Sequence, residues 1–339
     1  MNVGFIITKS EVGGAQAWVK NVSGFCENSR RFLISSEHGW LNSFFADEQS
    51  LTLPSMGKLF FLRDLFRLKK FIRQHNIGLL VASSAHAGVM ARLVKLLTPV
   101  QVYYVSHGWS FNYNGGLLRF AFRKIEQWLA ALTDKIICIS GADYQIAQET
   151  LKIEQDKLLL IPNKVFQRQA SGLEPPLDRR PNSPNLLYLA RLEALKRPDL
   201  LNLLNHFSVQ IDVIGQGSLA TQILPASNIR LCGEVKNFGN FSAYDGLVLL
   251  SDSEGLPMSA IEAAACGLPL FLSDVGGCSE LVRYQNGMVT PNDAMALQEN
   301  FSYFLNKLPY FSKQAQHASK YFDLNADRDI WQTLFKNPA

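Results

Sequence analysis

The stretch GLVLLSDSEGLPMSAIEAAACGLPLFLS, residues 246–273, predicts a strand, a loop, a helix and a second strand. The runs at 246–251 and 268–273 are short and apolar, which favours strands buried in a parallel sheet. Between them, Pro257 suits the first position of a helix, the alanines favour the helix, and Gly267 ends it. Strand, helix and strand in this order form the repeating unit of a parallel sheet that is covered by helices.

The same alternation extends through most of the chain. Further buried strands are expected at 2–8, 31–35, 77–82, 100–105, 135–140 and 157–162, and then at 185–190, 209–215 and 228–233. Helical periodicity lies between them, at 14–29, 58–75, 86–97, 116–133 and 141–151, near 197–206 and from 293 onward.

Residues 163–185 interrupt this alternation, because they contain several prolines and show no periodicity. The sequence therefore predicts an α/β protein of two Rossmann-like domains, whose parallel sheets face each other across a cleft. The expected parts are an N-terminal domain at 1–165, a linker at 166–184, a C-terminal domain at 185–322, and a C-terminal helix at 323–339 that packs back towards the N-terminal domain.

The composition narrows the range of functions. Of the 339 residues, 47% are hydrophobic and 18% are charged, which is enough for two cores and unlike a disordered chain. The net charge of +4 is too small to indicate nucleic acid. The excess of basic side chains lies in the first 165 residues, which favours an anionic surface or substrate there.

The five cysteines are scattered and include no C-x-x-C pair, which is typical of a reducing compartment without disulfides or structural zinc. The first residues lack the charged and long apolar regions of a signal peptide. No run approaches the roughly 18 apolar residues of a membrane span. We therefore expect a cytoplasmic protein.

Two carboxylates flank the start of the helix in the opening stretch. Glu254 lies in the loop before the helix and Glu262 lies inside it. The free amide groups at 256–259 form an anion site, and a diphosphate there would leave the two acids near hydroxyl groups on either side. That pattern describes a nucleotide sugar. The alternative is that Glu254 caps the helix and Glu262 lies on a solvated face of it, since capping acids are common at helix starts.

Residues 251–282, SDSEGLPMSAIEAAACGLPLFLSDVGGCSELV, resemble the donor-site motif of retaining glycosyltransferases with the GT-B fold, in particular glycosyltransferase family 4 (glycosyl transferases group 1). The motif has an acid, a glycine, a small apolar residue and a proline, then a second acid, and "GLP…D.GG..E". The resemblance implies that Glu262 holds the ribose of the donor and Glu254 its sugar. It also implies donor contacts from Gly255, Leu256 and Pro257.

Three further segments of the second half resemble the same family. YLARLEALKRPDLL, 188–201, is similar to its "GRL…K" segment, which implies that Arg191 and Lys196 bind the diphosphate. Two cations there would offset the charge of the leaving group, where other enzymes use a metal. Ala190 and Arg197 replace common glycines. VIGQGS, 213–218, implies a donor contact at Gly215, and LCGEV, 231–235, implies that Val235 contacts the base.

In the first half, EVGGAQ, 11–16, lacks the third glycine of a dinucleotide fingerprint, which disfavours NAD. It resembles the family's glycine loop, which implies that Gly13 and Gly14 approach the donor phosphate. A plain turn is the alternative. YYVSHGWSFN, 103–112, places His107 after a strand, where the resemblance implies contact with the transferred sugar. A lone histidine is otherwise more often structural. VASSAHAGVMAR, 81–92, resembles a family segment that is usually richer in His and Lys.

Residues 57–76 predict a basic amphipathic helix. Its expected apolar face comprises Phe61, Leu62, Leu65, Leu68 and Ile72. One interpretation is a helix that covers the sheet and has a basic outer face, and the other is contact with an anionic membrane. Further basic side chains occur at Arg119, Arg123 and Lys124.

The resemblance therefore implies a retaining, metal-independent hexosyltransferase without a cofactor. It would move a sugar from a nucleoside diphosphate sugar to a glycan or lipid-linked acceptor in bacterial capsule, O-antigen, lipopolysaccharide or exopolysaccharide biosynthesis. The N-terminal domain would bind the acceptor, and the C-terminal domain the donor. No nucleic-acid partner is expected, and the inner face of the cell membrane is a candidate contact. The alternatives are a sugar-nucleotide epimerase or hydrolase, and a non-catalytic nucleotide-sugar-binding subunit. The catalytic candidates are His107, Glu254, Arg191 and Lys196.

Overall fold

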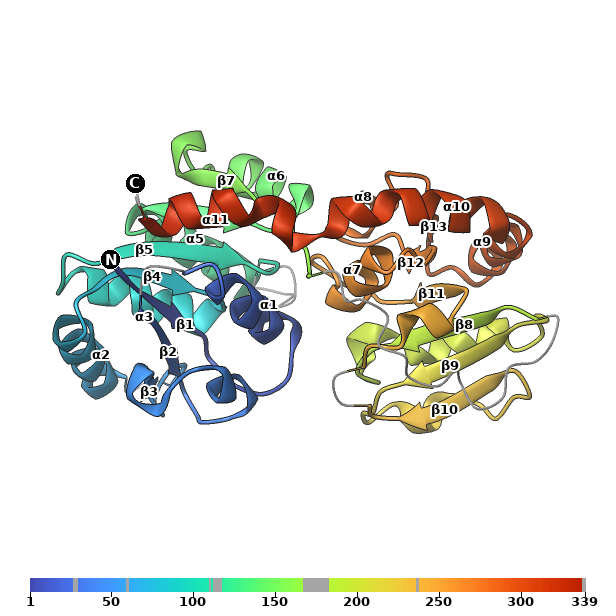
Figure 1. Ribbon diagram of the computed structural model, residues 1–339, viewed down its shortest axis with the longest axis horizontal. Helices are drawn as coiled ribbons and strands as arrows, with labels where there is room; N and C mark the ends of the chain where they lie inside the picture. Colours follow the sequence, from blue (N-terminus) through green and yellow to red (C-terminus); the bar gives the residue numbers. More distant parts are fainter. Residues whose placement is uncertain are drawn as a thin grey trace. The chain divides into compact units, whose positions relative to one another are not determined.

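The computed structural model describes residues 1–26, 30–58, 61–109, 111, 118–166, 183–235 and 238–336. The chain forms two compact units (Figure 1). The first comprises Met1–Pro162 together with Asn325–Ala339, and the second comprises Asn163–Leu324. Each unit is an α/β domain built on a parallel sheet, as the alternation of strands and helices predicts.

The first unit is built on a seven-stranded parallel sheet with the strand order β3-β2-β1-β4-β5-β6-β7. The order reverses between β1 and β4, which is where ligands bind in open sheets of this kind. The strands are β1 (Asn2–Ile6), β2 (Arg31–Ser35), β3 (Ser50–Thr52), β4 (Ile77–Ala82), β5 (Gln101–Ser106), β6 (Lys135–Cys138) and β7 (Leu158–Leu160). The helices are α1 (Gly14–Ser23), α2 (Leu62–Gln74), α3 (Ala85–Lys95), α5 (Leu118–Ala131), α6 (Gly141–Glu149) and α11 (Arg328–Lys336).

Alternate side chains of these strands are buried on opposite faces of the sheet, because successive residues of a strand point to opposite sides. One face packs against α2, α3, α5 and α6 in a single apolar cluster that includes Leu80 and Tyr104. On β1, Phe5 meets Phe335 of α11 edge to face, with ring centroids 5.8 Å apart. The C-terminal helix therefore belongs to the core of the first unit.

The second unit contains a six-stranded parallel sheet with the order β10-β9-β8-β11-β12-β13. This order also reverses, between β8 and β11. The strands are β8 (Asn185–Leu189), β9 (Gln210–Ile214), β10 (Ile229–Gly233), β11 (Gly246–Leu249), β12 (Leu270–Ser273) and β13 (Gly287–Thr290). The helices are α7 (Met258–Ala265), α8 (Cys278–Leu281), α9 (Ala294–Asn306) and α10 (Leu308–Ala318).

The structure differs from the sequence-based expectations in several elements. The short strands β3 and β13 were not predicted. The segment near 197–206 is a 3₁₀ helix, Pro198–Leu204, and not an α-helix. In α2, Leu62 is 65% exposed, so its assignment to the buried face was wrong. Most of the expected linker, 167–182, lies outside the described residues.

Candidate active site

Two residues predicted for the donor site meet at the carboxyl ends of β8 and β11. The ammonium group of Lys196 lies 2.5 Å from Oε1 of Glu254, and Ser251 donates a hydrogen bond of 2.6 Å to the same oxygen. The Glu254 side chain is 8% exposed and that of Lys196 is 23% exposed. The carboxylate is therefore held in place by a cation and a hydroxyl group, with its second oxygen not used by these bonds.

The loop that carries Glu254 is fixed by the glycines of the "DVGG" segment. Gly277 donates a backbone hydrogen bond of 2.8 Å to the carbonyl oxygen of Gly255. Gly276 has a φ of +53°, and a Cβ atom there would overlap the carbonyl oxygen of Glu254. A side chain at this position would thus displace the loop, which gives the paired glycines a structural reason.

A second set of hydrogen bonds supports the same loop from β12 and β13. The backbone amide of Ser251 donates to Oγ of Ser273 at 2.9 Å. Ser273 in turn donates to Oδ1 of Asn292 at 2.5 Å, and Nδ2 of Asn292 donates to the carbonyl oxygen of Ser251 at 3.0 Å. The loop therefore depends on residues that the sequence analysis did not select.

Helix α7 begins directly after this loop. Pro257 is its N-cap residue, and no side chain caps the first turn. The first amide groups of an α-helix have no partner inside the helix, so they point forward as hydrogen-bond donors. Glu262 lies inside α7 and is partly buried. As predicted, Glu254 lies in the loop before the helix and Glu262 lies within the helix.

Arg197 follows Lys196 in a left-handed conformation, with φ +39° and ψ +50°. Only glycine adopts this conformation without strain. Two carboxylates hold the guanidinium group: Asp199 accepts from Nε at 2.9 Å and from Nη2 at 2.8 Å, and Asp252 accepts from Nη1 at 3.0 Å. Hydrogen bonds from Arg197 lower the pKa of Asp199. Arg197 therefore links the Lys196 loop to the Glu254 loop.

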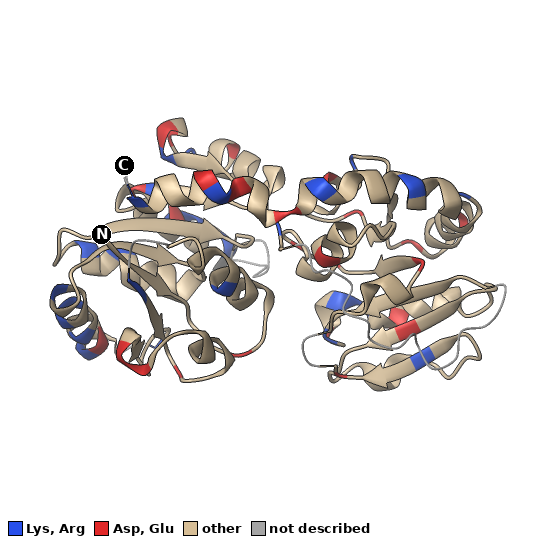
Figure 2. Cartoon of the chain, viewed as in Figure 1, with Lys and Arg blue, Asp and Glu red and all other residues tan. Residues whose placement is uncertain are grey.

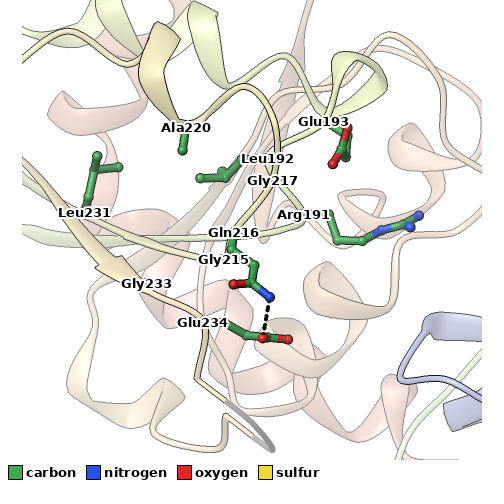
Figure 3. A pocket seen from close by; sticks show the side chains of 10 residues that line it. All are labelled: Arg191, Leu192, Glu193, Gly215, Gln216, Gly217, Ala220, Leu231, Gly233 and Glu234. Carbon is green, nitrogen blue, oxygen red and sulfur yellow. Dashed lines mark hydrogen bonds between the residues drawn. The ribbon is translucent and has the colours of Figure 1, made fainter. Parts of the chain in front are cut away.

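A pocket of about 670 Å³ lies beside these loops in the second unit (Figure 3). Arg191 and Gly215, both predicted donor contacts, line it, and Nε2 of Gln216 donates a hydrogen bond of 2.7 Å to Glu234. Val235, which is 44% exposed, follows Glu234 but does not line the pocket. The full lining consists of Arg191, Leu192, Glu193, Gly215, Gln216, Gly217, Ala220, Leu231, Gly233 and Glu234.

Gly215 has a structural role at this pocket. Its φ is +150°, and a Cβ atom there would overlap the carbonyl oxygen of Ala190. The turn after β9 therefore requires the backbones of the two loops to approach each other closely. In Figure 3 the side chain of Arg191 extends away from Leu231 and Ala220, to the other side of the view.

The first unit carries His107 at the carboxyl end of β5. Oγ of Ser83, which follows the neighbouring strand β4, lies 2.7 Å from Nε2 of His107. The edge of Trp18 on α1 meets the imidazole ring, with centroids 5.5 Å apart. Burial lowers the pKa of His107 to about 4, because it disfavours the charged imidazolium. The imidazole is therefore neutral at neutral pH.

Gly13 and Gly14 open α1, which carries Trp18. Gly13 is the N-cap with φ −175°, an extended conformation that any residue adopts, and Gly14 is the first residue of the helix. Neither glycine is required by its backbone angles. Ser83 and Trp18 are site residues that the sequence analysis did not assign, although the position of Ser83 beyond a predicted strand was a usable signal.

Over the described ranges, no group of three or more His, Cys, Asp and Glu side chains is arranged to hold a metal ion. In the same part of the chain, no helix is both long enough and apolar enough to cross a membrane.

Known proteins resemble this chain over nearly its whole length. Residues 33–165 match the model "Glycosyltransferase Family 4" and residues 183–307 match "Glycosyl transferases group 1". The O-antigen biosynthesis glycosyltransferase WbnH of Escherichia coli is 41% identical over 332 residues, which cover 95% of each chain. The protein is a family 4 glycosyltransferase. The resemblance seen in the sequence is thereby confirmed.

Two further proteins are similar to this glycosyltransferase. The UDP-Gal:alpha-D-GlcNAc-diphosphoundecaprenol alpha-1,3-galactosyltransferase of E. coli is 25% identical over 283 residues, 74% of this chain and 73% of that protein. The crystal structure of Anabaena HepE in complex with UDP and glucose superimposes with a TM-score of 0.81 at 19% identity, and covers 99% of this chain and 100% of that one. The latter likeness confirms the GT-B fold.

Within the glycosyltransferase, the predicted residues divide between the two units. Gly13, Gly14 and His107 belong to the first, and all the others belong to the second. In the second unit, Lys196 and Glu254 are in contact, whereas Arg191 and Gly215 line the pocket.

Proposed function

We propose that this glycosyltransferase moves a sugar from a nucleoside diphosphate sugar to a glycan or lipid-linked acceptor in O-antigen assembly, with retention of the anomeric configuration. The observation that carries the proposal is the contact between Lys196 and Glu254 at the uncapped start of α7. The identity with WbnH supports the O-antigen context. The relative that is named for a diphosphoundecaprenol substrate supports a lipid-linked acceptor.

In this proposal the second unit binds the donor. The first amides of α7, together with Arg191 and Lys196, hold the diphosphate, because they combine fixed positive charge with free donors. Glu262 accepts hydrogen bonds from the ribose hydroxyl groups and Glu254 from those of the donor sugar. Gly215 lets the backbone approach the donor, and Gly255, Leu256 and Pro257 shape the turn beneath the sugar. Val235 contacts the base.

The chemical step breaks the bond between the anomeric carbon and the phosphate oxygen. Its electron pair goes to the departing nucleoside diphosphate, and the acceptor hydroxyl oxygen forms the new bond on the same face of the sugar. The acceptor proton goes to the leaving phosphate oxygen. Arg191 and Lys196 stabilise the charge that grows on that phosphate, so we propose that no divalent metal or other cofactor is needed. His107 contacts the sugar, whose charge becomes positive in the transition state.

The test measures transfer directly. Purified protein is incubated with UDP-, GDP- and ADP-sugars and a lipid-linked acceptor, and the product is analysed by NMR for its anomeric configuration. We expect one donor class to give a retained product, with activity unchanged by EDTA. Glu254→Gln is expected to lower kcat by at least about a hundredfold, the range seen when a preorganised electrostatic contact is removed. Inversion, or dependence on magnesium, would contradict the proposed chemistry.

Two helices of the first unit support a second part of the proposal, contact with an anionic membrane on its cytoplasmic side. Helix α2 exposes Leu62 and Phe66 (57%) beside a row of cations, visible as blue bands in Figure 2. Helix α5 exposes Phe120, Ile125 and Trp128 (57%). Apolar side chains among cations favour binding to an anionic bilayer surface. All five cysteines are free thiols, which agrees with a reducing compartment.

Co-sedimentation with vesicles tests this contact. The protein is expected to pellet with phosphatidylglycerol vesicles and to remain in solution with phosphatidylcholine vesicles. Phe66→Ser combined with Trp128→Ser should weaken binding, whereas Tyr303→Ser on the second unit is the matched control at a similarly exposed aromatic residue (53%). Absence from both pellets would refute the membrane contact, and equal pelleting with both would refute its preference for anionic lipid; neither result affects the transferase assignment.

A further inference from the structure

The predicted catalytic histidine contacts a serine that follows the neighbouring strand β4. The register of β4 and β5 pairs Val81 with Tyr103 and Ala82 with Tyr104. Continued by one residue, this register places Ser83 beside Val105, and His107 lies two residues further along the chain on the same side of the sheet. This brings Oγ of Ser83 to 2.7 Å from Nε2 of His107.

Ser83 is 0% exposed, so its hydroxyl group has no access to water. Its one hydrogen-bond partner among the described residues is Nε2 of His107. A hydroxyl group has one proton to donate, and a buried donor without an acceptor is strongly disfavoured. If Nε2 carried the ring proton, that nitrogen would donate to Oγ and the hydroxyl proton would lack an acceptor. If Ser83 donates to an unprotonated Nε2, every donor in the contact is satisfied.

We propose that Ser83 is a positioning residue that holds His107 as the neutral Nδ1–H tautomer, so that the ring offers a hydrogen-bond donor to the ligand. Nδ1 makes no hydrogen bond with any described residue and is the nitrogen left for that role. The identity of the ligand as the donor sugar rests on the proposed function. The tautomer does not rest on it, because it follows from the contact within the first unit.

The aromatic neighbours of His107 fix the plane of its ring. Trp18 meets the imidazole at an interplanar angle of 82°, and Trp331 of α11 meets Trp18 at 77° with centroids 5.5 Å apart. The ring therefore cannot rotate freely to exchange its two nitrogens. Ser83 sets which nitrogen carries the proton, and Trp18 keeps that nitrogen in place.

A neutral donor at Nδ1 has a defined chemical use. The Nδ1–H group can donate a hydrogen bond to a sugar oxygen and so stabilise it. It takes up no proton from the acceptor hydroxyl group. This division agrees with a step in which the leaving phosphate receives the acceptor proton. His107 then orients the sugar by hydrogen bonding and does not serve as the general base.

The experiment observes the tautomer directly in the full-length protein labelled with ¹⁵N-histidine. Two-bond ¹H–¹⁵N correlations distinguish a protonated ring nitrogen from an unprotonated one, and His107→Asn assigns the signals by their disappearance. At pH 7 we expect Nδ1 to be protonated and Nε2 to be unprotonated. A wild-type spectrum with the proton on Nε2 would overturn the proposal without any variant.

Ser83→Ala removes the donor and is expected to shift His107 towards the Nε2–H tautomer. Ser106→Ala is the matched control: Ser106 is equally buried (0%), immediately precedes His107, and its hydroxyl group has no hydrogen-bond partner in the described chain. It should leave the tautomer unchanged. An unchanged spectrum in Ser83→Ala, with the fold verified by circular dichroism, would also overturn the proposal.

A kinetic measurement separates this inference from the proposed function. With an active donor, Ser83→Ala should lower kcat about tenfold with a small change in the donor KM, and Ser83→Cys, a weak donor, should fall between it and wild type. If no sugar is transferred from any donor while Nδ1 remains protonated, the proposed function fails and the tautomer stands. If transfer occurs and Nε2 carries the proton, the inference fails and the function stands.

Discussion

The ammonium group of Lys196 and the carboxylate of Glu254 form a 2.5 Å ion pair, although the residues are 58 positions apart in the chain. Each was predicted separately, one for the diphosphate and one for the sugar. In the structure they form a pair. Under the proposed function, a bound donor would share or replace this contact, which would couple recognition of the diphosphate to recognition of the sugar.

The pair predicts a specific pattern of stability. Lys196→Met should destabilise the fold by about 1–3 kcal/mol, because it leaves a mostly buried carboxylate without its cation. Adding Glu254→Gln to Lys196→Met should recover part of that loss, since the buried charge is then removed as well. Urea unfolding of the two single variants and the double variant measures the coupling. A double variant no more stable than Lys196→Met would show that the ion pair contributes little.

Arg197 provides a second prediction, based on its left-handed backbone. Arg197→Gly should be more stable than Arg197→Ala by about 1 kcal/mol, because alanine retains the strain of a positive φ and glycine relieves it. Both variants lose the contacts with Asp199 and Asp252 equally. Chemical denaturation of both variants measures the difference. Equal stabilities would mean that the loop relaxes out of this conformation.

Gly276 predicts a loss of donor binding through the backbone. Gly276→Ala should weaken donor binding at least about tenfold, because the new Cβ overlaps the carbonyl oxygen of Glu254. Gly267→Ala is the control, since Gly267 also has a positive φ (+78°) but its nearest neighbour would lie at 3.4 Å, an ordinary contact. Isothermal titration calorimetry with the active donor measures the donor affinity of the two variants and of the wild type. If both variants lose affinity alike, general destabilisation is responsible and displacement of the loop is not.

The lowered pKa of His107 predicts a pH dependence of stability. The imidazole has a pKa of about 4 in the folded protein and about 6.5 in the unfolded chain. Between these values the unfolded state binds a proton that the folded state does not, so stability falls as the pH decreases through this window. His107→Asn should reduce this slope. Denaturant unfolding from pH 7.5 to 4.5 measures the free energy of unfolding of the wild type and of His107→Asn. Identical slopes against pH would show that His107 is not the source of the pH dependence.

Trp331 predicts that α11 is essential to the first unit. The side chain is 1% exposed and packs on Trp18 and Phe335. Trp331→Ala should cost about 3–5 kcal/mol, the usual range for removing a buried tryptophan. Ile330→Ala, next to it but 47% exposed, should change stability by less than about 0.5 kcal/mol. Similar effects of the two substitutions would contradict the packing described.

The sequence was most informative where chemistry and periodicity coincide. The loop that carries Glu254 and the helix that carries Glu262 were predicted because Pro257, the alanines and Gly267 act locally. The two Rossmann-like domains were predicted because strands and helices alternate, and the GT-B fold was implied by the resemblance to family 4. The strands β3 (SLT) and β13 (GMVT) were missed because they do not lie in continuous apolar runs like those that indicated the strands predicted at 157–162, 246–251 and 268–273.

The remaining discrepancies depend on contacts between distant segments. The pairing of Ser83 with His107 requires the register of β4 and β5, which a single sequence does not specify. In the same way, the support of Ser251 by Asn292 joins loops that are 41 positions apart. Leu62 lies on the same side of α2 as Phe66, which is also exposed, so it stands beside the buried face formed by Leu65, Leu68 and Ile72.

The order of synthesis differs from the order in which the cores are completed. Helix α11 supplies Trp331 and Phe335 to the first unit, but the ribosome makes it only after the entire second unit. A nascent chain that ends before Asn325 therefore leaves Phe5 and Trp18 without part of their packing. The N-terminal unit is thus begun first and finished last, and its apolar surface stays incompletely covered until translation ends.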